Sequence, residues 1–382
     1  MIIVYTRSNP VNPDPRVEKE MHAALNNNHQ TIALGWERRS EIGNKITNSY
    51  LHINNQEVPI IRFNINADFG QGLGNLKAMI KWQFNLMKWL IKNRKKYDFI
   101  HAYDFDTVLP ALIMNLFFNK KYVYDICDFY IDAFGVPNKL KPIIKRIDFY
   151  AMSKAEAIIL VNEIRDSQIE GSKPKKKIYI HNTPVDLIGN SFENKTQNSK
   201  PTIFYGGILA EGRMILETIE ICKNNPDWNF IIAGFGHIED KCKKASEKYE
   251  NITFLGKVDY KKIIENTKKS DVVFACYDPD VPNNKYASPN KLYEAMMCGK
   301  PIIVCENTGV DKIVINENIG LVCRYDRTAL ENAFIKIIEN KVLSMEMGKK
   351  SRELYLTKYN WAIMENELNG FYNKIETLIN IK

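Results

Sequence analysis

The sequence predicts an α/β protein made of two successive doubly wound halves, each with a parallel sheet. At 382 residues the chain is two to three times the usual length of one domain. Short β-branched or aromatic runs alternate with helix-length amphipathic segments along most of it. These runs are apolar without a polar alternation, which is typical of strands that helices cover on both faces.

The strand candidates fall into two series separated by a polar connection. The first series comprises residues 2–5, 31–34, 99–101, 122–124, 157–161 and 178–181; the second comprises 202–205, 229–233, 252–255, 272–275, 301–304 and 320–323. Between them, Asn182-Thr183-Pro184 and the polar residues 190–200 predict a linker. We therefore expect domains at 1–185 and 186–360, with the terminal helix in 361–382 packing back onto the first domain.

Composition places the chain among ordinary globular proteins. Apolar residues make up 45% and charged residues 26%. The apolar runs are far shorter than the ~20 residues that a membrane-spanning helix needs. The seven cysteines form no Cys-x-x-Cys pair, and the first residues are typical of a strand rather than of a signal peptide. We expect a cytoplasmic protein with reduced thiols.

The net positive charge of the chain comes entirely from its first half. Residues 1–185 carry 26 Lys and Arg against 18 Asp and Glu, whereas the remaining residues carry 27 of each. Within this half, residues 77–97 predict a helix with a lysine stripe beside a wide apolar arc, which suits an anionic membrane surface. An ordinary surface helix with its tryptophans in the core is the alternative. Nucleic acid is not expected, because finger and RNP-like motifs are absent.

The densest chemical pattern is Ser288-Pro289-Asn290-Lys291 followed by Glu294. Ser288 predicts an N-cap and Pro289 the first helical position. A helix start offers free amides to a phosphate, and Glu294 lies about 9 Å further along the axis. This spacing fits a nucleotide, with the diphosphate at the helix start and the ribose on Glu294. A plain solvated glutamate is the alternative.

Two glycine-containing turns support an anion site. Gly206-Gly207 ends one strand candidate, and Arg213 opens the helix that follows. The glycines permit close backbone approach, and Arg213 can hold a phosphate bidentately. Gly234-Phe235-Gly236 ends the next strand, but without the third glycine of a dinucleotide fingerprint. A Walker sequence is also absent, which argues against a P-loop ATPase.

No metal or other cofactor is expected. Asp278-Pro279-Asp280 and Asp104-Phe105-Asp106 imitate a carboxylate pair that could hold Mg²⁺ or Mn²⁺. The proline-rich surroundings of Asp278 favour a simple turn, and the same interpretation applies to Asp104. The six histidines form no cluster along the sequence, so zinc is not indicated.

Several motifs occur together in a specific order. They are Asp14-Pro15-Arg16-Val17, His101-Ala102-Tyr103-Asp104, Asp125-Ile126-Cys127-Asp128, Asn182-Thr183-Pro184, Gly234-Phe235-Gly236, Gly256-Lys257-Val258, Ser288–Glu294 and Gly299-Lys300-Pro301. In this order the chain resembles, over nearly its whole length, a family-4 (group 1) retaining glycosyltransferase. The resemblance implies the GT-B fold, two Rossmann-like domains facing each other across a cleft.

The resemblance also implies a function and a set of site residues. The donor would be a UDP- or GDP-sugar, and the acceptor a glycan or a lipid-linked molecule at the inner face of the membrane, in the synthesis of cell-surface polysaccharide or glycoconjugates. Donor contacts would come from Gly207, Arg213, Gly234, Lys257, Val258, Ser288, Pro289, Asn290, Lys291 and Glu294. Asp128 and His101 would orient the acceptor, and Arg213 would stabilise the leaving diphosphate.

Three positions depart from the family's pattern. Cys127 stands where many relatives have histidine, Tyr286 replaces a glutamate that touches the donor sugar, and Ile208 occupies an arginine position. A thiol cannot readily replace imidazole as a hydrogen-bond donor to a sugar hydroxyl. Two alternatives stay open: a nucleotide-sugar epimerase of the same fold, and a non-catalytic protein that binds sugar nucleotides.

Overall fold

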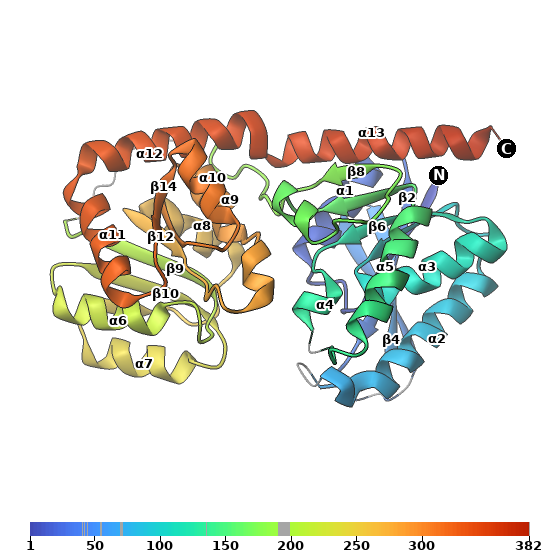
Figure 1. Cartoon of the computed structure of the whole chain (residues 1–382), viewed down its shortest axis with the longest axis horizontal. Helices are drawn as coiled ribbons and strands as arrows, with labels where there is room; N and C mark the ends of the chain where they lie inside the picture. Colours follow the sequence, from blue (N-terminus) through green and yellow to red (C-terminus); the bar gives the residue numbers. More distant parts are fainter. Residues whose placement is uncertain are drawn as a thin grey trace. The chain divides into compact units, whose positions relative to one another are not determined.

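The computed structural model describes residues 1–39, 41, 43, 45–53, 56–68, 72–134, 136–189 and 199–381. The chain divides into two compact units (Figure 1). Unit 1 comprises Met1–His181 and Met364–Lys382, and unit 2 comprises Asn182–Ile363. These bounds differ by a few residues from the predicted 1–185, 186–360 and 361–382. Most of the predicted polar connection, residues 190–198, lies outside the described residues.

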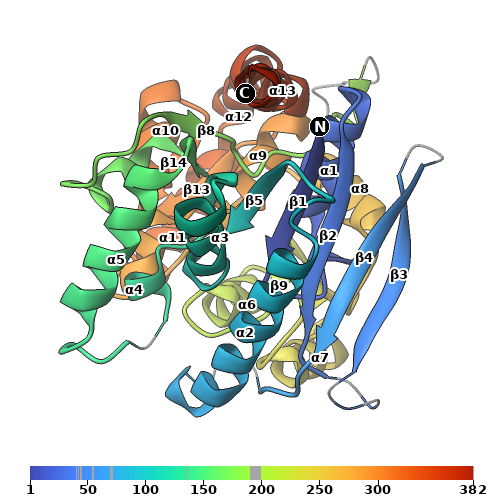
Figure 2. The ribbon, with the colours of Figure 1, turned by 90° about the vertical axis from the view of Figure 1, so that its right-hand side faces the viewer.

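Unit 1 is built on an eight-stranded sheet with the order β3-β4-β2-β1-β5-β6-β7-β8. The strands are β1 (Ile2–Arg7), β2 (Gln30–Glu37), β3 (Ile46–Ile53), β4 (Gln56–Asn64), β5 (Phe99–Tyr103), β6 (Lys121–Ile126), β7 (Ala157–Leu160) and β8 (Lys177–Tyr179). All neighbours are parallel except β3, which pairs antiparallel with β4 at one edge. Figure 2 shows β1, β2, β4 and β3 side by side.

The hairpin β3–β4 is absent from the predicted strands. Its first strand alternates between exposed and half-buried residues, as expected of an edge strand with one solvated face. Continuous apolar runs mark strands that are covered on both faces, and β3 has no such run. In the sequence, Ile46, Asn48 and Tyr50 alternate with Thr47 and Ser49, and this period of two was the signal that indicates a strand.

In the described part of unit 1, five helices lie between the strands: α1 (Pro15–Asn26), α2 (Leu76–Lys92), α3 (Phe105–Phe118), α4 (Tyr130–Ala133) and α5 (Lys141–Lys154). Asp14 caps α1, because its carboxylate accepts hydrogen bonds from the amides of Arg16 and Val17. The long terminal helix α13 (Trp361–Asn380) packs on the same unit, where the Tyr372 hydroxyl lies 2.9 Å from that of Tyr5. Within the described residues, no helix is long and apolar enough to cross a membrane.

Unit 2 is an all-parallel six-stranded sheet with the order β11-β10-β9-β12-β13-β14. Its strands are β9 (Thr202–Ile208), β10 (Asn229–Phe235), β11 (Ile252–Phe254), β12 (Val272–Ala275), β13 (Ile302–Cys305) and β14 (Gly320–Cys323). Counted from β9, this is the order 3-2-1-4-5-6 of a Rossmann domain. The prediction of two parallel-sheet, Rossmann-like domains is confirmed.

The helices of unit 2 follow the strands in turn. They are α6 (Ile215–Asn224), α7 (Glu239–Lys248), α8 (Tyr260–Lys269), α9 (Asn290–Cys298), α10 (Val310–Glu317), α11 (Arg327–Glu339) and α12 (Lys341–Leu354). Apolar side chains of β9, β12 and β13 form the core between them, and Phe274 packs against Tyr205 with 5.2 Å between ring centroids and the rings tilted by 43°. Alternate strand residues therefore serve two helix layers, which explains why the strands are apolar throughout.

Asp148 of α5 makes the stability of unit 1 depend on pH. This carboxyl is fully buried beside Tyr124, and burial raises its pKa to about 7. The folded state therefore binds a proton more tightly than the unfolded state, so stability rises as pH falls through 7. We expect the unfolding free energy to be about 1 kcal/mol higher at pH 6 than at pH 8 because of this group.

The test of that pH dependence is urea unfolding of the wild type and Asp148→Asn at both pH values. The variant should lose this part of the pH dependence and be the more stable protein at pH 8. An unchanged slope in Asp148→Asn would assign the effect to another group.

Gly370 is an exposed glycine inside α13, and no heavy atom lies within 4 Å of the position where its Cβ would stand. Glycine costs a helix interior about 0.5–1 kcal/mol relative to alanine. We expect Gly370→Ala to raise the unfolding free energy by that amount, measured by urea denaturation. A loss of stability would mean that this face of α13 is covered in solution.

Candidate functional site

The strand orders define where a ligand binds in each unit. The order reverses between β9 and β12 in unit 2, and between β1 and β5 in unit 1. In open α/β sheets, ligands bind at the carboxyl ends of the strands that flank such a point. Of the predicted site residues, Arg213 lies in the loop after β9, and residues 288–294 lie in the loop after β12 and in the helix α9 that follows it.

Glycines let the donor-side loops of unit 2 approach each other closely. A Cβ on Gly234 would stand 1.8 Å from the carbonyl oxygen of Gly207, and one on Gly236 would stand 2.3 Å from that of Leu209. Both glycines have φ near +150°, a conformation that other residues rarely adopt. The Gly234 amide also donates to the carbonyl oxygen of Gly256 at 2.8 Å. Contacts between backbone atoms thus join the ends of β9 and β10 and the loop after β11.

Two cations face these loops. The guanidinium of Arg213 lies 4.9 Å from the ring centroid of Tyr277, and the Lys291 ammonium lies 5.9 Å from the same centroid and 4.5 Å from that of Tyr205. A Cβ on Gly207 would stand 2.9 Å from Lys291 Nζ. Among the described residues, no carboxylate pairs with either cation within 4.0 Å. Two neighbouring cations that no described carboxylate pairs with are a candidate anion site.

The start of α9 differs by one residue from the prediction. The helix begins at Asn290, and Pro289 is the N-cap residue without a side-chain hydrogen bond. Ser288 therefore lies outside the helix and is not the cap; its hydroxyl lies 3.1 Å from that of Tyr293. The first amides of α9 have no capping side chain, which leaves them to a ligand.

Glu294 is buried, with 6% of its surface exposed, so the solvated alternative is wrong. The side chain hydrogen-bonds to Tyr260. Burial and the nearby carboxylate together raise the pKa of Tyr260 far above its usual value. The side chain also lines a small cavity of about 10 Å³ with Lys291, Gly206, Phe204, Thr267 and Val273. A carboxylate has several lone pairs, so Glu294 can accept hydrogen bonds from a ligand hydroxyl in addition to the one from Tyr260.

The remaining predicted donor residues lie along the same edge. Lys257 is exposed, with its ammonium 5.3 Å from the ring centroid of Phe235, and Val258 packs partly against the core. Tyr286 ends a short 3-10 turn, and Ile208 is 52% exposed at the end of β9. In the Asp278-Pro279-Asp280 turn, the carboxylate of Asp278 accepts from the Asp280 amide at 2.9 Å.

In unit 1, Asp104 ties the ends of three strands together. Its Oδ1 accepts from the amides of Cys127 at 2.9 Å and Asp128 at 3.0 Å, and its Oδ2 accepts from Arg7. Arg7 also donates to Asp14 at 3.1 Å, and its Nη1 lies 3.5 Å from Cys127 Sγ. Burial raises the pKa of Asp104 to about 7, although Arg7 opposes the shift. Neither Arg7 nor Asp104 was among the predicted site residues.

Asp128 and His101 occupy different environments. The side chain of Asp128 is 46% exposed and lies 3.3 Å from Arg165, so a ligand can reach it. His101 has no exposed surface, and its Nδ1 lies 2.7 Å from the hydroxyl of Tyr372 in α13. A direct contact between His101 and a substrate, which the prediction required, is not possible in this structure because the ring is enclosed on all sides.

The other face of His101 meets a buried ion network. Its Nε2 lies 3.4 Å from Glu20 and 3.5 Å from Asp125, while Arg16 binds Asp125 through two nitrogens at 2.8–3.0 Å. Burial raises the pKa of Glu20 to about 6, whereas Arg16 lowers that of Asp125 against the effect of burial. Because the Arg16 guanidinium already neutralises these carboxylates, the group is not a vacant cation site.

Part of unit 2 is similar in sequence to known glycosyltransferases. Residues 190–354 match the family described as glycosyl transferases group 1. A 151-residue segment is 30% identical to an uncharacterized glycosyltransferase of Methanocaldococcus jannaschii, covering 38% of this chain and 36% of that protein. A 152-residue segment is 25% identical to a phosphatidyl-myo-inositol mannosyltransferase of Mycobacterium leprae, covering 40% and 39%. The chain thus spans less than half the length of these relatives.

The likeness to solved structures extends over the whole chain. Sucrose-phosphate synthase from Thermosynechococcus elongatus aligns with a TM-score of 0.74 at 14% identity, covering 99% of this chain and all of that one. This likeness concerns the fold alone, and it supports the predicted GT-B class of two Rossmann-like domains.

Proposed function

We propose that this protein is a retaining glycosyltransferase that moves a sugar from a UDP- or GDP-sugar to a glycan or lipid-linked acceptor. One observation carries the proposal: Arg213 and Lys291 face glycine-containing turns at the switch point of unit 2, and no carboxylate of the described residues forms an ion pair with either. The family match over residues 190–354 supports it.

In this proposal, separate groups of the protein would bind the separate parts of the donor. The diphosphate would lie between Arg213, Lys291 and the first amides of α9, where a double negative charge meets two cations and a helix start. The ribose diol would donate to Glu294. The base would meet backbone groups around Gly234, Lys257 and Val258.

The same cations would lower the barrier of transfer. As the sugar–phosphate bond breaks, negative charge grows on the leaving diphosphate, and Arg213 and Lys291 stabilise it more in the transition state than in the ground state. The diphosphate would take the proton of the acceptor hydroxyl. This mechanism needs no nucleophile from the protein, so Cys127 in place of histidine is compatible with turnover.

Unit 1 would supply the acceptor side. Asp128 is exposed enough to accept a hydrogen bond from a sugar hydroxyl, and Arg7 with Asp104 fixes the backbone that carries it. His101 would act as a positioning residue, because it holds Asp125 and, through Arg16, the first turn of α1.

A membrane contact through residues 77–97 is part of this proposal. In α2, Trp82, Leu86 and Leu90 are buried, as the core alternative required. However, Leu76, Ile80 and Phe84 are 43%, 58% and 68% exposed. Apolar side chains beside lysines at positions 77, 81 and 88 suit an anionic lipid surface. Pelleting with anionic vesicles should fall for Lys81/Lys88/Lys92→Glu but not for Lys243/Lys244→Glu in α7.

The donor site is tested by thermal shift with UDP- and GDP-sugars. A ligand at 100 times its dissociation constant adds about 2.7 kcal/mol to the folded state. We expect one nucleotide class to raise the melting temperature of the wild type and of Glu346→Ala, an exposed control in α12, but not of Glu294→Ala. No shift with any nucleotide sugar would contradict the proposal, and a shift without transfer or donor hydrolysis would indicate the non-catalytic alternative.

A further inference from the structure

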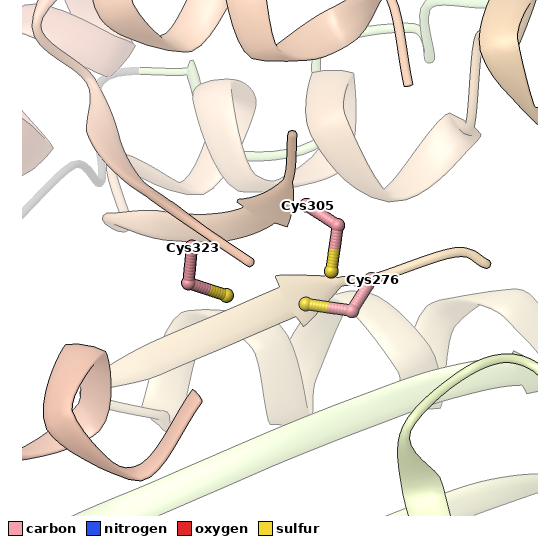
Figure 3. A group of neighbouring side chains, drawn as sticks. All are labelled: Cys276, Cys305 and Cys323. Atoms are coloured by element: carbon pink, nitrogen blue, oxygen red, sulfur yellow. The ribbon is translucent and has the colours of Figure 1, made fainter. Parts of the chain in front are cut away.

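Three cysteines occupy one row across unit 2. Cys305 on β13 is the register partner of Cys323 on β14, and Ala275 of β12 pairs with Val304, which places Cys276 beside Cys305. Neighbouring strands lie about 4.8 Å apart. Figure 3 shows the three side chains pointing toward one another, and their sulfur atoms all lie within 4.8 Å of each other.

A fourth sulfur joins this cluster from a separate segment. The Sδ atom of Met214, at the start of α6, lies 3.8 Å from Cys305 Sγ. All four residues are buried, with exposures of 0–6%. Metal–thiolate bonds of about 2.3 Å place the sulfurs of one site about 4 Å apart, which is close to the spacing here.

The donor set selects the kind of ion. Within the described part of the chain, the group of side chains that converges here contains thiols alone, without histidine or carboxylate. Thiolate and thioether sulfur favour soft ions, above all Cu(I), and disfavour Mg²⁺ and Mn²⁺. Burial among apolar residues of the core also shields such an ion from water and oxidants.

We propose that Cys276, Cys305 and Cys323 bind one Cu(I) ion, with Met214 Sδ as an additional ligand. Binding would exchange thiol protons for the metal, and the protons would pass to solvent; no electron transfer is involved. The site is independent of the proposed glycosyltransferase activity, since none of its four residues is assigned to the donor.

The experiment is an anaerobic Cu(I) titration of the fully reduced protein, followed by gel filtration against a weak Cu(I) chelator. We expect one equivalent of copper to be retained, with a thiolate-to-copper charge-transfer band in the ultraviolet and release of protons. Cys305→Ala should retain none, whereas Cys242→Ala, which removes a buried cysteine of α7 outside the cluster, should retain the full equivalent. Neither the wild type nor either variant should retain Mg²⁺.

Further variants separate a lost site from a lost fold. Circular dichroism melts without copper report whether Cys305→Ala folds; if it does not, Cys323→Ala at the sheet edge and Met214→Leu take its place. Copper binding should be weaker in Cys323→Ala. Met214→Leu should still retain copper, with a lower affinity than the wild type. Failure of the wild type to retain copper, or equal retention by all cluster variants, would overturn the proposal. So would a disulfide between two of these cysteines that persists under the reducing conditions of the titration.

Discussion

Replacing Arg16 by methionine is expected to lower the free energy of unfolding by about 3–5 kcal/mol, because it leaves two buried carboxylates without their cation. Arg16 contacts Asp125 at 2.8 Å and Glu20 at 3.2 Å, and neither carboxylate has exposed side-chain surface. It also donates to the carbonyl oxygen of Ile180 at 2.8 Å, so the change also leaves a backbone acceptor unpaired.

Urea unfolding at pH 7.5 measures this effect. Arg146→Met, on the exposed face of α5, is the matched control and should stay within about 0.5 kcal/mol of the wild type. Lowering the pH should partly rescue Arg16→Met, since protonation of Glu20 removes one of the unpaired charges. A loss below 1 kcal/mol would mean that water enters this network.

Gly234→Ala is expected to destabilise unit 2 by several kcal/mol or to prevent its folding. The new methyl group would stand 1.8 Å from the Gly207 carbonyl oxygen, and the backbone atoms on that side cannot rotate away as a flexible side chain could. The positive φ of residue 234 adds strain for any residue with a Cβ.

Gly256→Ala separates strain from collision. Its φ of +65° is also unusual, yet nothing lies within 4 Å of its would-be Cβ. We expect a loss of about 1 kcal/mol in that variant, with donor-induced melting shifts preserved. Equal losses in Gly234→Ala and Gly256→Ala would show that the loops after β9 and β10 separate readily in solution.

The central strands could be predicted because burial on both faces leaves an uninterrupted apolar signal. Residues 272–275 and 320–323 were predicted with the bounds that β12 and β14 have. Parallel strands present their carboxyl ends at one edge of the sheet, where ligands bind. This rule made Arg213, Lys291 and Glu294, which follow such strand ends, candidates for the site.

Other features depend on contacts that are distant in sequence. The exposed alternation of β3 resembles a loop, and the hydrogen bond between Glu294 and Tyr260 depends on the packing of α8 beside α9. His101 was expected at a surface, but Tyr372, 271 residues later, closes over it. The convergence of three cysteines needs the strand order, which the sequence pattern alone did not supply.

The backbone of Asp104 has a consequence for the entropy of acceptor binding. Its φ of +58° is strained for a residue with a side chain, and the hydrogen bonds to the amides of Cys127 and Asp128 hold it there. The loops after β5 and β6 are therefore already ordered before any ligand arrives. An acceptor that fits this surface pays little to immobilise it, whereas one that does not fit cannot reshape it at low cost. Selectivity on this side would then arise from rigidity rather than from the number of contacts.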